Sequence, residues 1–215
     1  MKILFLGDSI TEGVGASCEA ARYVNRVAAM TGHEVHNYGV SGTRIARQIP
    51  VYQKTIWNYD FRLRLTIMPE SADMVFIFGG TNDYGHGRLP LGTPADKSGS
   101  FCSELKLLID ELIEKYGKEK LCFMLPLHRY FEDGIACKGE SGTEMGATLA
   151  QYVQTMREII GGYGIDYIDL YENGFARPAV ANGTDGYTVD GLHPNDKGCQ
   201  VIADRVCEYL KARGF

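Results

Sequence analysis

Short apolar runs alternate with amphipathic stretches along the whole chain. Most of the runs are rich in β-branched and aromatic residues, and the pattern predicts strands at 2–6, 34–38, 73–78, 120–125 and 165–170, with 2–6 and 73–78 buried. Apolar residues at helical spacing predict helices at 19–30, 43–48, 55–65, 101–116, 147–160 and 195–213. This alternation is typical of βαβ units with right-handed crossovers, so we expect an α/β fold with about five parallel strands.

Two stretches, 84–99 and 128–146, lack either period and are rich in turn-forming or polar residues. We expect them to form loops over the edge of the sheet, where they would wall a pocket. The stretch 171–188 also reads as a loop, with room for a short helix. The sequence contains no repeat or interdomain linker, which predicts a single domain over residues 1–215.

The composition is that of an ordinary globular protein, with 45% hydrophobic and 23% charged residues. A net charge of −5 and the absence of Lys or Arg runs argue against nucleic acid or an anionic membrane as a partner. No apolar run approaches the roughly 18 residues of a membrane span. The first apolar run is too short for a signal peptide, which favours a cytoplasmic location. The oligomeric state is left open.

The six cysteines occur without any CxxC pair, and a chain of this size does not depend on disulfides for a core. We therefore expect free thiols, most of them buried. The cysteines also lack the spacing of zinc ligands, so no zinc site is expected. Neither another metal nor an organic cofactor is expected.

The candidate chemistry begins where the first strand ends, at Gly7-Asp8-Ser9. Ser9 follows the carboxyl end of a buried strand, which is where ligands bind in open α/β sheets. A serine here can also simply cap the next helix. Near the other end of the chain, Asp190 precedes His193 by three residues. Together they supply the hydroxyl, imidazole and carboxylate that a serine hydrolase needs.

Four short blocks follow one another in an order that resembles the GDSL, or SGNH, hydrolase family. They are Gly7-Asp8-Ser9-Ile10, Gly39-Val40-Ser41-Gly42, Gly79-Gly80-Thr81-Asn82-Asp83 and Asp190-Gly191-Leu192-His193-Pro194. The resemblance implies a flavodoxin-like, three-layer α/β/α sandwich. It also implies that Ser9 is the nucleophile, His193 the general base and Asp190 its partner.

The resemblance further implies an oxyanion hole made by the backbone N–H groups of Ser9 and Gly42 and by the side-chain amide of Asn82. Taken alone, Gly42 could be an ordinary turn glycine and Asn82 a helix cap. Gly39 is the alternative backbone donor.

Candidate substrate contacts are Asp8, Tyr84, His86 and His128. Tyr84 and His86 follow Asn82 in the first predicted loop, and His128 follows the fourth strand. Asp8 and Asp83 are also suited to hold their own turns by accepting backbone N–H groups.

The favoured function is a serine esterase that cleaves a small, acetyl-like ester, possibly on a sugar, through an acyl-Ser9 intermediate. An acyltransferase would use the same residues, so the sequence does not separate the two. A flavodoxin-like protein that binds phosphate or flavin at the glycine-rich turns is the non-catalytic alternative. It would need neither Asp190 nor His193, and no GxGxxG pattern supports it.

Overall fold

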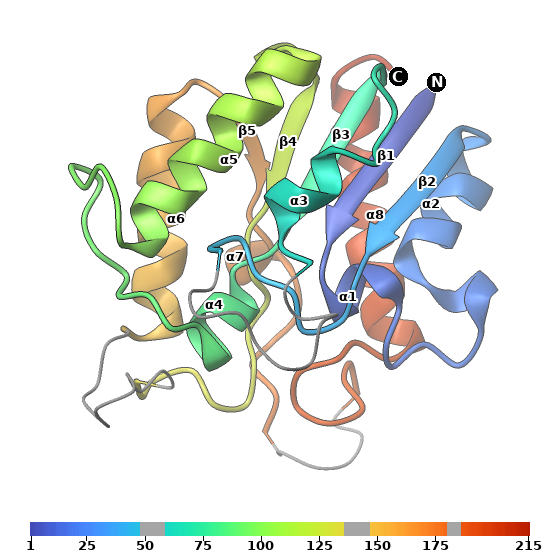
Figure 1. Ribbon diagram of the computed structural model, residues 1–215. Helices are drawn as coiled ribbons and strands as arrows, with labels where there is room; N and C mark the ends of the chain where they lie inside the picture. Colours follow the sequence, from blue (N-terminus) through green and yellow to red (C-terminus); the bar gives the residue numbers. More distant parts are fainter. Residues whose placement is uncertain (48–58, 136–146, 180–185) are drawn as a thin grey trace.

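A computed structural model describes residues 1–47, 59–135, 147–179 and 186–215, and within them it shows one parallel sheet (Figure 1). The strands are β1 (Lys2–Gly7), β2 (Glu34–Gly39), β3 (Met74–Phe78), β4 (Leu121–Met124) and β5 (Asp166–Ile168). Their order in the sheet is β2-β1-β3-β4-β5, and every neighbouring pair is parallel. The predicted fold class is confirmed.

The strand order creates a switch point beside β1. The chain passes from β1 to β2 on one side and then crosses to β3 on the other. Gly7, the last residue of β1, is in register with Gly39 of β2 and Phe78 of β3. The three strands therefore end at one edge, and such an edge at a switch point is where α/β sheets bind ligands.

Helices cover both faces of the sheet, which gives the three layers of the sandwich (Figure 1). They are α1 (Ser9–Glu12), α2 (Tyr23–Thr31), α3 (Phe61–Leu65), α4 (Thr81–His86), α5 (Phe101–Tyr116), α6 (Leu149–Gly162), α7 (Leu170–Asn173) and α8 (Asp196–Ala212). Leu4 and Leu6 pack with α3, α5 and α6, whereas Ile3 and Phe5 pack with α2 and α8. Alternate side chains of β1 thus lie in the two cores on opposite faces of the sheet.

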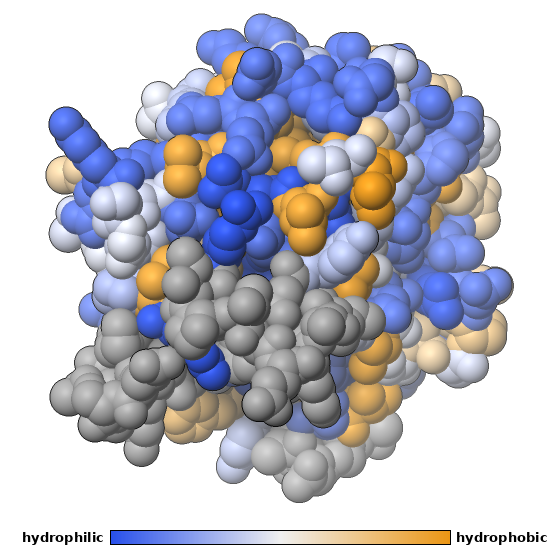
Figure 2. Space-filling model, viewed as in Figure 1, coloured by the Kyte–Doolittle hydropathy of each residue, from blue (hydrophilic) through white to orange (hydrophobic). Residues whose placement is uncertain are grey.

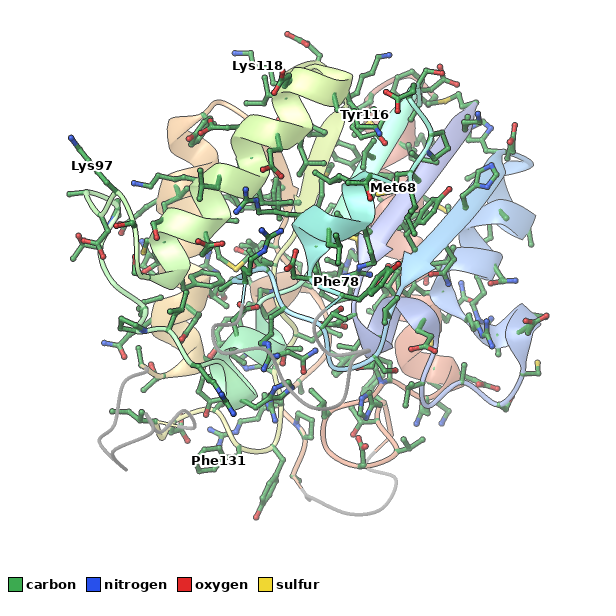
Figure 3. The ribbon with its side chains drawn as sticks, viewed as in Figure 1. Met68, Phe78, Lys97, Tyr116, Lys118 and Phe131 are labelled. Carbon is green, nitrogen blue, oxygen red and sulfur yellow. The ribbon has the colours of Figure 1, made fainter. Side chains whose placement is uncertain are left out.

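The two cores leave a mostly polar exterior. On the face that carries α3 and α5, apolar residues are exposed only in separate places in the described part (Figure 2). Tyr116 at the end of α5 reaches across to the chain after α3, where its hydroxyl donates to the carbonyl of Pro69 at 2.7 Å. Figure 3 marks Tyr116 and the neighbouring Met68 there, and it marks Phe131 beyond the carboxyl end of the sheet.

Several predicted elements differ from the structure. The helix predicted at 19–30 is a short 3₁₀ turn, Glu19–Ala21, followed by α2, because Arg22 between them is extended. The helix predicted from 43 is absent from the described residues up to Arg47. The backbone N–H groups of Ile45 and Ala46 are bound instead by the carboxylate of Asp83.

The loop predicted at 84–99 is also wrong at its start, because α4 extends to His86. Of the helix predicted at 55–65, the structure shows α3, which Asp60 caps. The rest of that prediction falls partly on 48–58, outside the described residues. Residues 128–135 contain no helix or strand, and 136–146 lie outside the description.

Five cysteines lie in the described segments, and all five are free thiols, with Cys102, Cys122 and Cys199 buried. Cys137 lies outside the described residues. None of the described helices has the length and apolar character needed to cross a bilayer.

Candidate active site

Ser9 is the first residue of α1, and only Asp8 separates it from the end of β1. The carboxylate of Asp8 caps this short helix by accepting the Ile10 N–H at 3.0 Å. The turn needs glycine at position 7, because a β-carbon there would lie 1.9 Å from Thr11 Oγ1. The sequence thus places the Ser9 hydroxyl at the carboxyl edge of the sheet, with 6% of the residue exposed.

His193 brings its imidazole to this hydroxyl from the far end of the chain. Its Nε2 lies 3.0 Å from Ser9 Oγ, and its Nδ1 lies 2.6 Å from Asp190 Oδ2. An ionised carboxylate only accepts hydrogen bonds, so Nδ1 carries the proton and Nε2 offers its lone pair to the hydroxyl. Ser9, His193 and Asp190 therefore form one hydrogen-bonded series.

The loop that carries Asp190 holds its own geometry. Asp190 Oδ1 accepts the N–H of His193 at 2.7 Å and that of Leu192 at 3.0 Å. Burial alone would raise the pKa of Asp190, but the hydrogen bonds from His193 and Leu192 hold that pKa below its ordinary value. The carboxylate is therefore ionised at neutral pH, as a partner for an imidazolium must be.

The turn at 39–42 has a single backbone donor without a partner among the described residues. Gly39 gives its N–H to Asn37 Oδ1 at 2.8 Å, Val40 to the carbonyl of Gly7, and Ser41 to the carboxylate of Glu12. The N–H of Gly42 remains. Gly39, the alternative donor in the sequence prediction, is occupied.

Asn82 lies on α4 with 6% of its surface exposed. Its Nδ2 donates to the carbonyl of Thr43 at 2.9 Å, so the amide lies beside the residue that follows Gly42. Its Oδ1 lies 3.1 Å from His86 Nε2. The structure therefore brings Asn82 to the 39–42 turn, and it does so through a bond that the sequence did not indicate.

His86 faces protein groups with both ring nitrogens, because Arg44 Nη1 lies 2.9 Å from its Nδ1. Burial, together with the charges of Arg44 and Arg129, lowers the pKa of His86 to about 4. His86 is thus neutral at physiological pH. No ring nitrogen is left for the substrate contact that the sequence suggested.

Tyr84 is fully buried, and its hydroxyl donates to the carbonyl of Gly134 at 3.0 Å. Arg129 lies 5.3 Å from the centre of its ring. Burial therefore removes Tyr84 from the surface at which the sequence placed it as a substrate contact. The tyrosine instead anchors the chain that follows β4.

His128 pairs with the buried carboxylate of Glu132, with Nδ1 to Oε1 at 2.8 Å. Its ring lies 3.9 Å from that of Tyr171. Close by, the backbone N–H of Tyr130 donates to the carbonyl of Gly191 at 2.7 Å. The segment after β4 is therefore fixed to the loop between Asp190 and His193, which gives it a place at the wall of the site.

Two carboxyls of the predicted turns are buried. Burial raises the pKa of Asp8 to about 6, against the lowering effect of the Ile10 N–H and the charge of His193. Asp83 accepts the N–H groups of Ile45 and Ala46, at 3.0 and 2.8 Å. Both are structural anchors next to residues of the site.

Sequence reasoning missed Glu12 and Arg44, which hold the 39–42 turn and His86. Glu12 offered no signal beyond its position after Ser9, and Arg44 none at all, since their partners are distant in the sequence. The described residues contain no cluster of three or more side chains suited to a metal ion.

A parallel sheet that carries serine, histidine and aspartate in hydrogen-bonded series at its carboxyl edge is typical of a serine hydrolase. Comparison with known proteins is more specific. The profile of the GDSL-like Lipase/Acylhydrolase family matches residues 5–201, and the chain belongs to this family. The family is named for lipases and acylhydrolases, which cleave acyl esters.

Solved structures resemble the fold over its whole length. A protein from Lactobacillus plantarum superposes with a TM-score of 0.78 at 27% identity, covering 98% of this chain and 96% of its own. A protein from Chitinophaga pinensis described as a possible lipase gives a TM-score of 0.70 at 19% identity, covering 99% and 98%.

A relative from Xylanibacter ruminicola that is named acetylxylan esterase is 23% identical over 98% of this chain. The match covers 43% of the relative, so the chain spans less than half the length of that protein.

Proposed function

We propose that the protein hydrolyses a small acyl ester, most simply an acetyl ester, through an acyl intermediate on Ser9. The observation that carries this proposal is the contact of His193 Nε2 with Ser9 Oγ at 3.0 Å, with Asp190 bound behind the ring. A serine hydroxyl is a poor nucleophile at neutral pH, and a base within hydrogen-bond reach overcomes this.

In the first half-reaction, Ser9 Oγ attacks the ester carbonyl while its proton passes to His193 Nε2. Asp190 stabilises the resulting imidazolium, and Nε2 then gives the proton to the departing alcohol. In the second half-reaction, His193 takes a proton from water, and the hydroxide attacks the acyl group. The imidazolium returns its proton to Ser9, and the carboxylic acid is released.

The oxyanion of each tetrahedral intermediate needs fixed donors. We assign this role to the N–H groups of Ser9 and Gly42 and to Nδ2 of Asn82. The support for Gly42 is that its N–H has no other partner in the described parts of the 39–42 turn. Each such donor lowers the barrier by on the order of 3 kcal/mol.

The choice of an acetyl ester on a carbohydrate rests on two supports. The relative from Xylanibacter ruminicola is named an acetylxylan esterase. The segment after β4, fixed to the Asp190 loop, presents Tyr130 and Phe131 with 43% and 50% of their surfaces exposed. Exposed aromatic rings beside a site offer flat apolar faces on which a sugar ring can stack.

The test is hydrolysis of p-nitrophenyl acetate by the wild type and by the variants Ser9→Ala, His193→Ala and Asp190→Asn. We expect kcat/KM to fall on the order of a thousandfold in the first two and at least about a hundredfold in the third. Ser17→Ala and His36→Ala are matched controls, since both side chains bind other surface residues. Full activity of Ser9→Ala would overturn the mechanism.

Two further assays address the substrate. A p-nitrophenyl ester series from acetyl to decanoyl should show the highest kcat/KM at the short end, and acetylated xylo-oligosaccharides should release acetate. A preference for chains of about ten carbons or more would contradict the small acyl group. Transfer of the acetyl group to an added sugar in place of hydrolysis would contradict water as the natural acceptor.

A further inference from the structure

We propose that His86 is a positioning residue that fixes the orientation of the Asn82 amide, so that Nδ2 and not Oδ1 faces the oxyanion. This inference rests on the proposed function, in which Asn82 is an oxyanion donor. It assigns to His86 a role that neither the sequence motifs nor the contacts of Ser9 indicate.

An asparagine amide can occupy the same space in two orientations that exchange its oxygen and its nitrogen. In an oxyanion hole the two orientations have opposite effects, because Nδ2 donates to the negative oxygen and Oδ1 repels it. A donor of this kind is therefore effective only if its surroundings allow one orientation. The neighbours of Asn82 meet this requirement on both sides of the amide.

The first neighbour is His86, whose own hydrogen position is set by Arg44. A guanidinium always donates and never accepts, so Arg44 Nη1 at 2.9 Å requires a lone pair on His86 Nδ1. The proton of the neutral ring must then be on Nε2. This N–H donates to Asn82 Oδ1 at 3.1 Å. It could not donate to Nδ2, which would occupy this place if the amide were reversed.

The second neighbour is the carbonyl of Thr43, which accepts from Asn82 Nδ2 at 2.9 Å. In the reversed amide, two acceptor oxygens would face each other here, while two donors would face each other at His86. The native orientation uses one hydrogen of Nδ2 and leaves the second for the substrate. Thr43 follows Gly42 in the chain, so the Asn82 amide lies beside the turn that carries the Gly42 N–H.

Arg44 is itself held in place. The residue is 1% exposed, and its Nη1 also donates to the backbone carbonyl of His86 at 2.9 Å. The next two residues of the chain, Ile45 and Ala46, give their N–H groups to Asp83. The segment that carries Gly42 is thereby bound to α4 at several adjacent points, and the orientation of His86 follows from the fold.

Protonation of His86 would place a second N–H against Arg44. Burial and the nearby cations keep the pKa of His86 at about 4, so the neutral ring persists under physiological conditions. His86 therefore holds the Asn82 amide in one orientation throughout the physiological pH range.

A double-mutant cycle tests the inference, because a merely structural role would lower activity whether or not Asn82 is present. The variants His86→Leu, Asn82→Ala and the double variant are assayed with p-nitrophenyl acetate, and thermal unfolding reports folding. We expect His86→Leu to lower kcat by at least about tenfold with KM changed less than about twofold. In the Asn82→Ala background, the same substitution should cost less than about twofold.

A conservative pair sharpens the test and serves if His86→Leu does not fold. The amide of His86→Gln can donate to Asn82 Oδ1 from the place of Nε2, whereas the shorter His86→Asn can face Arg44 alone. Higher kcat in the glutamine variant supports the inference.

Equal kcat in the glutamine and asparagine variants would overturn it, as would an equal loss from His86→Leu in both backgrounds. A normal kcat in Asn82→Ala would instead remove Asn82 from the oxyanion hole. Loss of activity in Ser9→Ala then shows whether the esterase mechanism itself still holds.

Discussion

The carboxylate of Glu12 accepts both the hydroxyl of Ser41 and its backbone N–H, the latter at 2.7 Å. Glu12 ends the short helix that begins at Ser9, and Ser41 immediately precedes Gly42. One side chain thus ties the helix of the proposed nucleophile to the turn of a proposed oxyanion donor. Fixing these two elements relative to each other is what a preorganised site requires.

Substituting Glu12 should therefore lower catalysis more than substrate binding. In Glu12→Gln, a donor NH₂ replaces one acceptor oxygen and competes with the two donors of Ser41. We expect kcat to fall by about tenfold with KM changed little. Glu19→Gln is the control, because the Glu19 side chain is exposed and its carboxylate pairs with Arg22 at 3.5 Å. An unchanged kcat in Glu12→Gln would show that the turn needs no such anchor.

The contacts of Arg64 predict that its substitution lowers the stability of the fold rather than the catalytic rate. It is 1% exposed, and its guanidinium donates to the carbonyl of Gly7 at 2.6 Å and to Thr43 Oγ1 at 2.9 Å. Burial lowers the pKa of Arg64 to about 10, which leaves it charged at neutral pH.

Arg64→Leu removes a charged hydrogen-bond donor from each of these two buried oxygens, and we expect a loss of about 3 kcal/mol in unfolding free energy by urea titration. Arg22→Leu, whose side chain is partly exposed, should change it by less than about 1 kcal/mol. A loss in Arg64→Leu no larger than in this control would contradict the account.

The fold could be predicted largely from local patterns. The apolar run from Ile3 to Leu6 is a strand because a fully buried strand needs apolar residues on both faces, and 101–116 is a helix with the predicted bounds. The 43–48 prediction failed because Asp83, far along the chain, binds the N–H groups that a helix would use. A local pattern contains no information about such a partner.

The same limit applies to the site. The motifs named Ser9, Asp190 and His193, and the fold places them in hydrogen-bond contact. The environment of His86 depends on Arg44, which is distant in sequence and carries no motif. Its position after Asn82 in the first predicted loop made this histidine a candidate substrate contact, and only the tertiary structure shows that both of its nitrogens face the protein.

The carboxyl of Asp83 predicts a pH dependence of stability. Burial raises its pKa to about 6, against the N–H bonds from Ala46 and Ile45. The folded state therefore holds this proton at pH values where the unfolded state, with an ordinary pKa near 4, has lost it. Between about pH 4 and 6, this group makes the protein less stable as the pH rises, and above that range its contribution is constant.

Asp83→Asn removes the titrating carboxyl. Any effect of the amide itself on the unfolding free energy does not vary with pH. Relative to this variant, the wild type should lose up to ~1.4 kcal/mol of unfolding free energy for each pH unit through that window. Urea titrations at several pH values measure this difference. A difference that does not vary with pH, or one that varies in the opposite sense, would contradict a raised pKa at Asp83.

The central claim is that Ser9 is the nucleophile and that His193 activates it. The most direct measurement is the reaction of the protein with a fluorophosphonate, followed by intact mass and peptide mapping. We expect one adduct in the wild type on the peptide that contains Ser9, none in Ser9→Ala, and much slower labelling in His193→Ala. An adduct that persists in Ser9→Ala, or that maps to another serine, would contradict the account.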